Sequence, residues 1–307
     1  MRKIFFKTLE EFAKKDKNIF LLVADLGIKF FESFKEVDDK RALNVGVAEA
    51  NMVGVAAGLS MSGKNVYCYS ITPFLTMRAL EQIKVDIAFN NLNVKILGAG
   101  GGLVYGAEGI THHSIEDIAI MRSLPNMTIV CPGDAKEAEL LAKESITYPG
   151  PLYVRFGRDF NPLVHKGEID FKIGKGIIVN EGKDICIITA GTMLRGAVET
   201  IELLKKEGLS PALISMHTVK PLDRDLIDKC AKDYNYIFTI EDHNIIGGLG
   251  SAVSEVLSEN SYKGKFKRIG INDKYCSVAG KTDYLMEINK LDPENLSKTI
   301  LKKYKGN

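Results

Sequence analysis

Continuous apolar runs alternate with amphipathic stretches in the first half of the chain. Such runs are typical of parallel strands covered on both faces, and the stretches between them have helical spacing. The predicted strands are NIFLLVADLG, NVYCYS, NVKILGAG, MTIVC and PLYVRFGR. The predicted helices are MRKIFFKTLEEF, about Phe74 to Asn90 with Met77, Leu80, Ile83 and Ile87 on one face, SIEDIAIMRSL with Ser114 as its cap, and DAKEAELLAKESI with Asp134 and Glu137 as a capping box.

A second alternation follows a polar stretch. Residues 161–183 are punctuated by Pro and Gly, which predicts a linker. Beyond it, strands are predicted in DICIITAG, PALISMH, NYIFTIED and FKRIGIND, with helices between them. We therefore expect two α/β domains, a doubly wound one at 1–160 and a smaller one at 184–307.

The stretch NVGVAEANMVGVAAGL, from Asn44 to Leu59, predicts a buried strand, a tight turn that carries Glu49, and a closely packed helix of small residues. An acid between an apolar run and such a helix should be largely desolvated. Burial favours a protonated carboxyl, which makes this position a candidate for proton chemistry. The alternative is a solvated glutamate in the first turn of a helix, stabilised by the helix dipole.

Composition narrows the classes of partner. The 307 residues include 41 Lys and Arg against 39 Asp and Glu, and 45% of them are hydrophobic, as in ordinary globular proteins. No basic block is dense enough to indicate nucleic acid or an anionic membrane, and no apolar run has membrane-spanning length. The five cysteines lie far apart without histidines at ligand spacing, which favours reduced core thiols in a cytoplasmic protein over a zinc site.

The glycine-rich loop GAGGGLVYGAEGITHH meets no phosphate-binding motif, because it lacks GxGxxG before a helix and a GKS or GKT ending. Its glycines predict unusual dihedrals or close approach to a ligand instead. The chain also lacks the GxSxG of serine hydrolases. The pair His112–His113 has no carboxylate or cysteine at ligand spacing, so no metal site is predicted. A lone histidine is more often structural than catalytic.

Four motifs occur in a fixed order: GVAEANMVGVAAGL, TPFLTMRALEQI, GITHHSIEDIAIMRSLPNMTIVCPGDAKEAELL and GPLYVRFGR, followed by EDHNIIGGLGSAV in the second domain. In this order they resemble the C-terminal half of transketolase, its pyrimidine-binding domain followed by its C-terminal domain. The resemblance extends over the whole chain. ADLG and THHSIEDIAIMR resemble the transketolase branch rather than the beta subunits of 2-oxo acid dehydrogenases.

The resemblance implies thiamine diphosphate chemistry. In the family, the glutamate that matches Glu49 hydrogen-bonds the aminopyrimidine ring nitrogen and favours the imino tautomer that activates the thiazolium carbon. A carboxyl that donates to a neutral ring nitrogen must hold a proton, as burial would favour. Phe74, and Tyr69 as a weaker candidate, match aromatics that pack against the pyrimidine ring. Asp25, in ADL, matches an aspartate near the cofactor and the subunit interface.

The resemblance also implies substrate contacts. His112 matches the histidine of the family's THQ or THH motif, which contacts the substrate-derived intermediate. Arg158, in VRFGR, matches an arginine that binds the substrate's phosphate, and Arg2 lies where the family has a second such arginine.

Three departures from the family pattern concern the substrate pocket. Glu108 stands where the family has an aspartate that reads a sugar hydroxyl, and Gly100 where a histidine helps to hold sugar phosphate. A family serine beyond ADL is replaced in the region of Ile28 and Lys29. These changes leave the thiamine part intact and put the ordinary pentose-phosphate substrates in doubt, so the expected class is sugars or sugar phosphates.

The family holds the diphosphate and its Mg²⁺ with a GDG motif followed by Asn, and this chain has no GDG. We therefore expect a split transketolase, in which an N-terminal partner subunit holds Mg²⁺ and the diphosphate, assembled as a 2+2 heterotetramer. The alternatives are a subunit of another thiamine-dependent enzyme, of the deoxyxylulose-phosphate-synthase or 2-oxo acid dehydrogenase beta type, and a non-catalytic partner subunit with the same fold. Glu49, Phe74, His112 and Arg158 together argue against the non-catalytic alternative.

Overall fold

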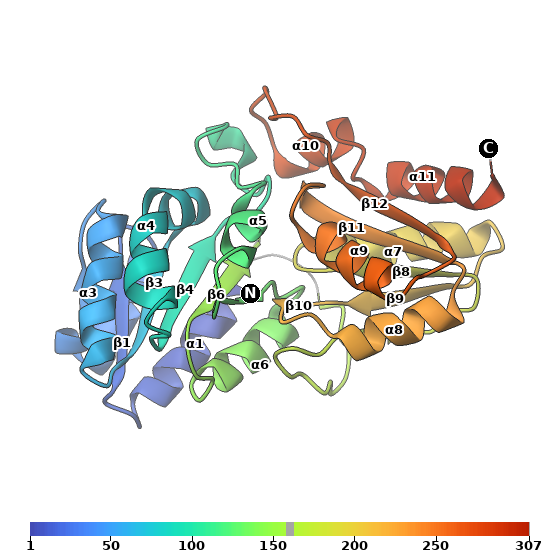
Figure 1. Ribbon diagram of the computed structural model, residues 1–307. Helices are drawn as coiled ribbons and strands as arrows, with labels where there is room; N and C mark the ends of the chain where they lie inside the picture. The colour runs from blue at the N-terminus through green and yellow to red at the C-terminus, as the bar shows by residue number, and fades with distance from the viewer. Residues whose placement is uncertain (158–162, 307) are drawn as a thin grey trace.

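The computed structural model describes residues 1–157 and 163–306, which form two groups of alternating strands and helices (Figure 1). The elements of the first half are α1 (Arg2–Ala13), β1 (Ile19–Val23), α2 (Ile28–Val37), η1 (Asp39–Arg41), β2 (Ala42–Asn44), α3 (Glu49–Met61), β3 (Asn65–Ile71), η2 (Phe74–Arg78), α4 (Leu80–Gln82), η3 (Ile83–Ala88), β4 (Val94–Ala99), η4 (Gly106–Glu108), α5 (Asp117–Arg122), β5 (Thr128–Val130), α6 (Ala135–Ser145) and β6 (Leu152–Phe156). Those of the second half are β7 (Ile177–Asn180), β8 (Ile185–Thr189), α7 (Met193–Lys206), β9 (Pro211–Ser215), β10 (Thr218–Lys220), α8 (Arg224–Asp233), β11 (Tyr236–Asn244), α9 (Leu249–Glu259), β12 (Lys265–Ile271), α10 (Thr282–Ile288) and α11 (Pro293–Lys305).

The strands build one sheet in each half. The first has the order β10-β5-β6-β4-β3-β1-β2 and the second the order β12-β11-β8-β9-β7. Neighbours are parallel except at one edge of each sheet, where β10 pairs with β5 and β7 with β9 in the antiparallel sense. The prediction of two α/β domains is confirmed.

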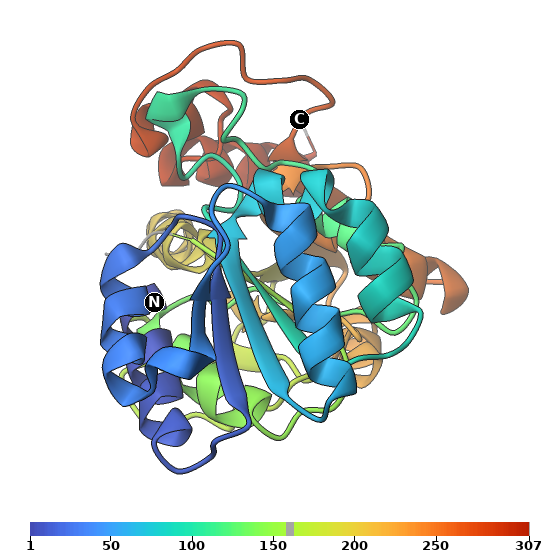
Figure 2. The same ribbon diagram turned by 90° about the vertical axis from the view of Figure 1, so that its left-hand side faces the viewer.

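Apolar side chains cover both faces of the first sheet, as the continuous apolar runs of its strands predict. Met52, Val53 and Ala56 of α3, with Ile83 and Ile87 of η3, pack on one face. On the opposite face, α1, α2 and α6 supply a second cluster that includes Phe5, Phe6, Phe34 and Leu141. Figure 2 shows the sheet edge-on between these two layers of helices.

The two halves share elements. β10 lies in sequence between β9 and β11 of the second sheet but pairs with β5 of the first. The carbonyl of Cys131, after β5, accepts from Gly191 N of the second half at 2.9 Å. In the other direction, β7 lies inside the range 161–183 that we predicted as a linker, and it pairs with β9. The five cysteines are buried free thiols, as predicted. No helix among the described residues is long and apolar enough to cross a bilayer.

Three local predictions need correction. The strand expected between Asn44 and Glu49 ends at Asn44; it lies at the sheet edge, and the next four residues form a loop in which Val47 is 69% exposed. The helix predicted from Phe74 to Asn90 contains two π-helical segments, η2 and η3. Because a π-turn is wider than an α-turn, the apolar face shifts its phase, and Met77 is exposed rather than buried.

The third correction concerns the cap of α5. The helix begins at Asp117 instead of Ser114, and Glu116 precedes it. Ser114 forms an isolated antiparallel bridge with Gly102 of the glycine-rich loop, with N···O distances of 2.7 and 2.9 Å. Pairing with the loop therefore keeps Ser114 extended.

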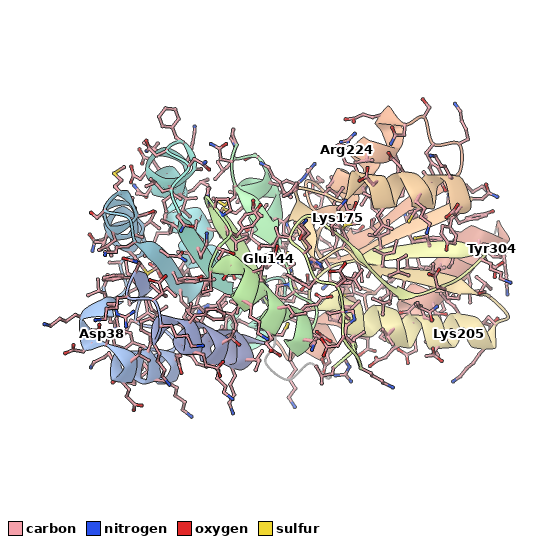
Figure 3. The ribbon with its side chains drawn as sticks, turned by 90° about the horizontal axis from the view of Figure 1, so that it is seen from below. Asp38, Glu144, Lys175, Lys205, Arg224 and Tyr304 are labelled. Carbon is pink, nitrogen blue, oxygen red and sulfur yellow. The ribbon has the colours of Figure 1, made fainter. Side chains whose placement is uncertain are left out.

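Buried polar groups fix the chain that joins the two domains. The N-cap residue of α6, Asp134, accepts from the backbone N of His165 at 3.0 Å, and His165 Nε2 lies 2.8 Å from Glu137 Oε1. Further on, the carboxylate of Glu144 accepts from Ile173 N at 3.0 and 3.1 Å. Figure 3 labels Glu144 on α6, near the junction of the two domains. The joining segment is thus held along the length of α6.

We expect the contribution of His165 to stability to depend on pH. Burial alone would lower the pKa of His165, but the hydrogen bond and charge of Glu137 raise it above its ordinary value. A raised histidine pKa gives stabilisation that is complete below about pH 6.5 and is lost as the pH rises through the folded-state pKa. Urea unfolding of wild type and His165→Gln should therefore differ most near pH 6 and less near pH 9.

The carboxylate of Glu137, the partner of His165, sets the acid end of the pH range in which the pair stabilises the fold. Burial would raise the pKa of Glu137, but the hydrogen bond from His165 and its other donors hold it below the usual range. Its stabilisation is complete above about pH 4.5 and is lost as the pH falls further. A wild-type minus variant difference that is flat, or that grows between pH 6 and pH 9, would contradict the expected role of His165.

Candidate active site

The candidate residues lie at the carboxyl-terminal edge of the first sheet. Asp25 follows β1, Ser70 lies near the end of β3, and the glycine-rich loop begins at Gly100 after β4. Because β1, β3 and β4 are parallel neighbours, their carboxyl ends bring these segments together. Glu49 begins α3 at the same edge.

The carboxyl of Glu49 is buried and has two partners. Its side chain is 1% exposed, Oε1 accepts from Ser70 Oγ at 3.0 Å, and Oε2 lies 2.6 Å from Arg78 Nη1. The expectation that Glu49 is desolvated is confirmed, and the alternative of a solvated first-turn glutamate is wrong. The buried carboxyl therefore has one hydroxyl donor and one cation, and the cation's side chain is 46% exposed.

An aromatic group stands next to this carboxyl. The guanidinium carbon of Arg78 lies 4.5 Å from the centre of the Phe74 ring. The His112 ring also meets Phe74 edge to face, with centres 5.1 Å apart and an angle of 68°. The structure therefore brings three sequence-predicted residues, Glu49, Phe74 and His112, into one cluster.

Arg2 extends the cluster through two tyrosines. Its Nη1 donates to the hydroxyl of Tyr105 at 2.8 Å and to that of Tyr69 at 3.3 Å. Tyr105 also faces His112, with ring centres 6.3 Å apart. Tyr105 thus contacts both Arg2, through its hydroxyl, and His112, through its ring.

Tyr69 contributes through its hydroxyl rather than its ring face. Its side chain is 1% exposed and packs edge-on against Phe6 at 4.9 Å, in the cluster of α1 and α2. Successive side chains of a strand point to opposite faces, so Tyr69 and its neighbour Ser70, which contacts Glu49, lie on different sides of β3. The ring of Tyr69 is therefore enclosed in the core.

Asp25 and Glu108 have exposed side chains that do not hydrogen-bond Glu49. Asp25 is exposed at a positive φ of 52°, and its backbone N donates to Asn44 Oδ1 at 3.1 Å. Glu108 is exposed at the end of η4. Arg158 lies outside the described residues. Of the two adjacent histidines, His113 is buried with Nε2 3.5 Å from Gly106 O, which gives it a structural position.

Close packing explains the glycines of the loop. A Cβ at Gly100, whose φ is +82°, would overlap the Tyr105 ring, and a Cβ at Gly102 would overlap the Asp242 carboxylate. A Cβ at Gly101 would lie 2.5 Å from Arg155 Nε. The positive φ angles of Gly100 and Gly102 confirm the prediction of unusual dihedrals, and the close approach seen here is to side chains of the chain itself rather than to a ligand.

Sequence reasoning missed Arg78 and Tyr105. Arg78 is the only cation in TPFLTMRAL, and Tyr105 is the only aromatic in the glycine-rich loop, so both stood out by type. What the sequence could not give is the contact of Arg78 with Glu49, because the packing of η2 against α3 brings these two residues together from distant positions in the chain. Among the described residues, no group of three or more His, Cys, Asp or Glu could hold a metal ion.

Comparisons with known proteins find matches over nearly the whole chain. Two family models match the chain: the transketolase pyrimidine-binding domain over residues 1–162 and the transketolase C-terminal domain over residues 174–295. A protein of Methanocaldococcus jannaschii, named a putative transketolase C-terminal section, is 41% identical over 99% of this chain and 96% of its own length.

Two further relatives are also of similar length. One of them, a subunit of the apulose-4-phosphate transketolase of Phocaeicola vulgatus, is 39% identical over 98% of this chain and 96% of its own. A solved structure titled a split gene transketolase, inactive beta4 tetramer, is 36% identical with a TM-score of 0.88, and the match covers 98% of this chain and 96% of that one.

Proposed function

The chain belongs to the transketolase family, and we propose that it is the C-terminal subunit of a split transketolase. In this role it is part of a transferase that moves a two-carbon ketol unit from a ketose to an aldose acceptor. Family membership implies thiamine diphosphate as the cofactor. The proposed substrates are sugars or sugar phosphates, in keeping with the sugar phosphate named for the Phocaeicola vulgatus relative.

The surroundings of Glu49 carry this proposal. A buried carboxyl beside an aromatic face suits a planar ring with a nitrogen to be hydrogen-bonded, as the aminopyrimidine has. The described residues therefore fit the pyrimidine end of the cofactor: Glu49 would hold the ring nitrogen and Phe74 would pack against the ring. When bound, the cofactor would supply the electron sink for the two-carbon unit.

The chain's own residues would then have distinct roles. Glu49 would hold a proton at the ring nitrogen, and the half-buried His112, 5.1 Å from the Phe74 ring, would contact the transferred unit. Arg2 would bind a substrate phosphate together with Arg158, and Tyr69 would position Arg2. We assign Glu108 to the acceptor sugar's hydroxyls and Asp25 to the region near the cofactor and the subunit interface.

An exposed helix face supports docking of a partner. α3 has no charged side chain after Glu49, and its outward positions include Gly54 and Gly58, where an added Cβ would meet nothing within 4 Å. α3 packs beside η3, where Val85 is 49% exposed and the following Phe89 is 81% exposed. An uncharged outer helix face such as that of α3, next to exposed apolar side chains, is typical of an interface.

We assign this face to the N-terminal partner subunit, which would hold the diphosphate and Mg²⁺. Magnesium needs oxygen ligands at fixed positions, and the part of the chain that the structure describes has no cluster of acids for it. Two copies of each chain would complete two active sites at the interfaces, giving a 2+2 heterotetramer.

Cofactor binding tests the proposal. We expect calorimetry with thiamine diphosphate and Mg²⁺ to detect binding to an equimolar mixture of this chain with its N-terminal partner, and none to either chain alone. Tight binding to this chain alone would contradict the divided site. Failure of the mixture to bind would contradict the proposed function.

A further inference from the structure

Arg78 holds both groups that the proposed site offers to the aminopyrimidine. Its Nη1 lies 2.6 Å from Glu49 Oε2, and its guanidinium carbon lies 4.5 Å from the Phe74 ring centre. The Arg78 side chain thus pairs with the Glu49 carboxyl and at the same time covers one face of the Phe74 ring. Arg78 itself is 46% exposed, so its guanidinium reaches the buried carboxyl from a solvent-accessible position.

The guanidinium has the features that would recognise an aminopyrimidine at this place. It is planar, it presents N–H donors at its edge, and it stacks on aromatic rings. The carboxyl of Glu49 accepts from that edge while Phe74 contacts the face. A ring that packed on this face of Phe74 and hydrogen-bonded Glu49 would overlap the position of the guanidinium.

We propose that the guanidinium of Arg78 occupies the place of the aminopyrimidine against Glu49 and Phe74, and that cofactor binding displaces it. This inference rests on the proposed function and adds to it an internal competitor, supplied by the chain itself. Arg78 can leave without a large penalty because it is half exposed and its stem comes from the end of η2. Ser70, by contrast, donates to the other oxygen of Glu49 and can stay in place.

Removal of the competitor should tighten cofactor binding. We expect Arg78→Met, mixed with the N-terminal partner, to bind thiamine diphosphate with Mg²⁺ about three- to tenfold more tightly than wild type, the range of one partly exposed ion pair and one cation–π contact. Arg78→Lys keeps the charge but loses the planar fork, so its affinity should lie between the two. The readout is the dissociation constant from calorimetry.

A chemical competitor separates this role from a merely structural one. Methylguanidinium chloride should weaken cofactor binding to the Arg78→Met mixture as its concentration rises, because it can enter the vacated place. It should affect wild type less, and tetramethylammonium chloride at equal ionic strength should have no such effect on the variant.

The outcomes separate the inference from the proposed function. Equal or weaker cofactor binding by Arg78→Met, while the wild-type mixture binds, would overturn displacement and show that Arg78 supports the site. If methylguanidinium did not weaken cofactor binding to the variant, the guanidinium and the aminopyrimidine would not occupy the same position, and the proposal would be wrong. If neither mixture binds the cofactor, the proposed function itself fails.

Discussion

Glu49→Gln in the two-chain assembly is expected to lower ketol-transfer activity by about 10² to 10⁴-fold, the range for loss of a positioned proton donor. The amide keeps the size of the side chain and can still accept from Ser70, so the fold should be retained. What it loses is the carboxyl proton that the proposed mechanism needs at the ring nitrogen. Steady-state rates with saturating cofactor measure the change.

Glu144→Gln is the matched control. The substitution is the same, and Glu144 lies on α6, where its carboxylate accepts from Ile173 N. We expect its activity to stay within about twofold of wild type, since an amide oxygen can accept the same hydrogen bond. Activity of Glu49→Gln close to that of Glu144→Gln would remove Glu49 from the mechanism.

The architecture could be predicted because the buried strands are continuous apolar runs, and helices of clear periodicity separate them. β7 and β10 were missed because each is short, with three or four residues, and is fixed by antiparallel pairing to a distant strand. α10 was missed for a related reason. It packs with Leu285 against Gly106 of the glycine-rich loop, a contact between distant parts of the sequence.

The candidate site was only partly predictable. The burial of Glu49 was predicted correctly, although the buried strand expected before it is an exposed loop. The groups that contact its carboxyl, Ser70 of β3 and Arg78 of η2, come from distant parts of the sequence. The role of Phe74 and His112 came from resemblance, and their approach to 5.1 Å depends on how η2 and the glycine-rich loop pack. Arg78 was overlooked because its contact with Glu49 joins residues 29 positions apart in the chain, which no local sequence pattern reveals.

The position of the glycine-rich loop depends on the second domain. Arg155 of β6 donates from Nε to Asp117 Oδ2 at 2.9 Å and from Nη1 to Asp242 Oδ1 of β11 at 2.6 Å. Thr192 donates to the other oxygen of Asp242 at 2.6 Å. The backbone of Gly102 packs against the Asp242 side chain. The glycine-rich loop, which also carries His112, therefore contacts the second domain at this network.

Charge and burial make this network sensitive to substitution. Arg155 is 3% exposed, and its two carboxylate partners are 0% and 3% exposed. Burial alone would raise the pKa of Asp242, but the charge of Arg155 and the donors around it hold it below its ordinary value. Without Arg155, two buried carboxylates would be left without their cation.

Arg155→Met is therefore expected to lower the free energy of unfolding by about 3 to 5 kcal/mol, as when one partner of a buried ion pair is removed. Urea unfolding followed by circular dichroism measures it. Arg195→Met is the matched control, because Arg195 pairs with Glu199 on the surface of α7 with side chains 50% and 48% exposed; its loss should be about 0 to 1 kcal/mol. Equal losses in the two variants would show that Arg155 does not hold the domains together. A large loss of unfolding free energy in Arg155→Met alone would show that Arg155 stabilises the contact between the two domains, on which the glycine-rich loop packs.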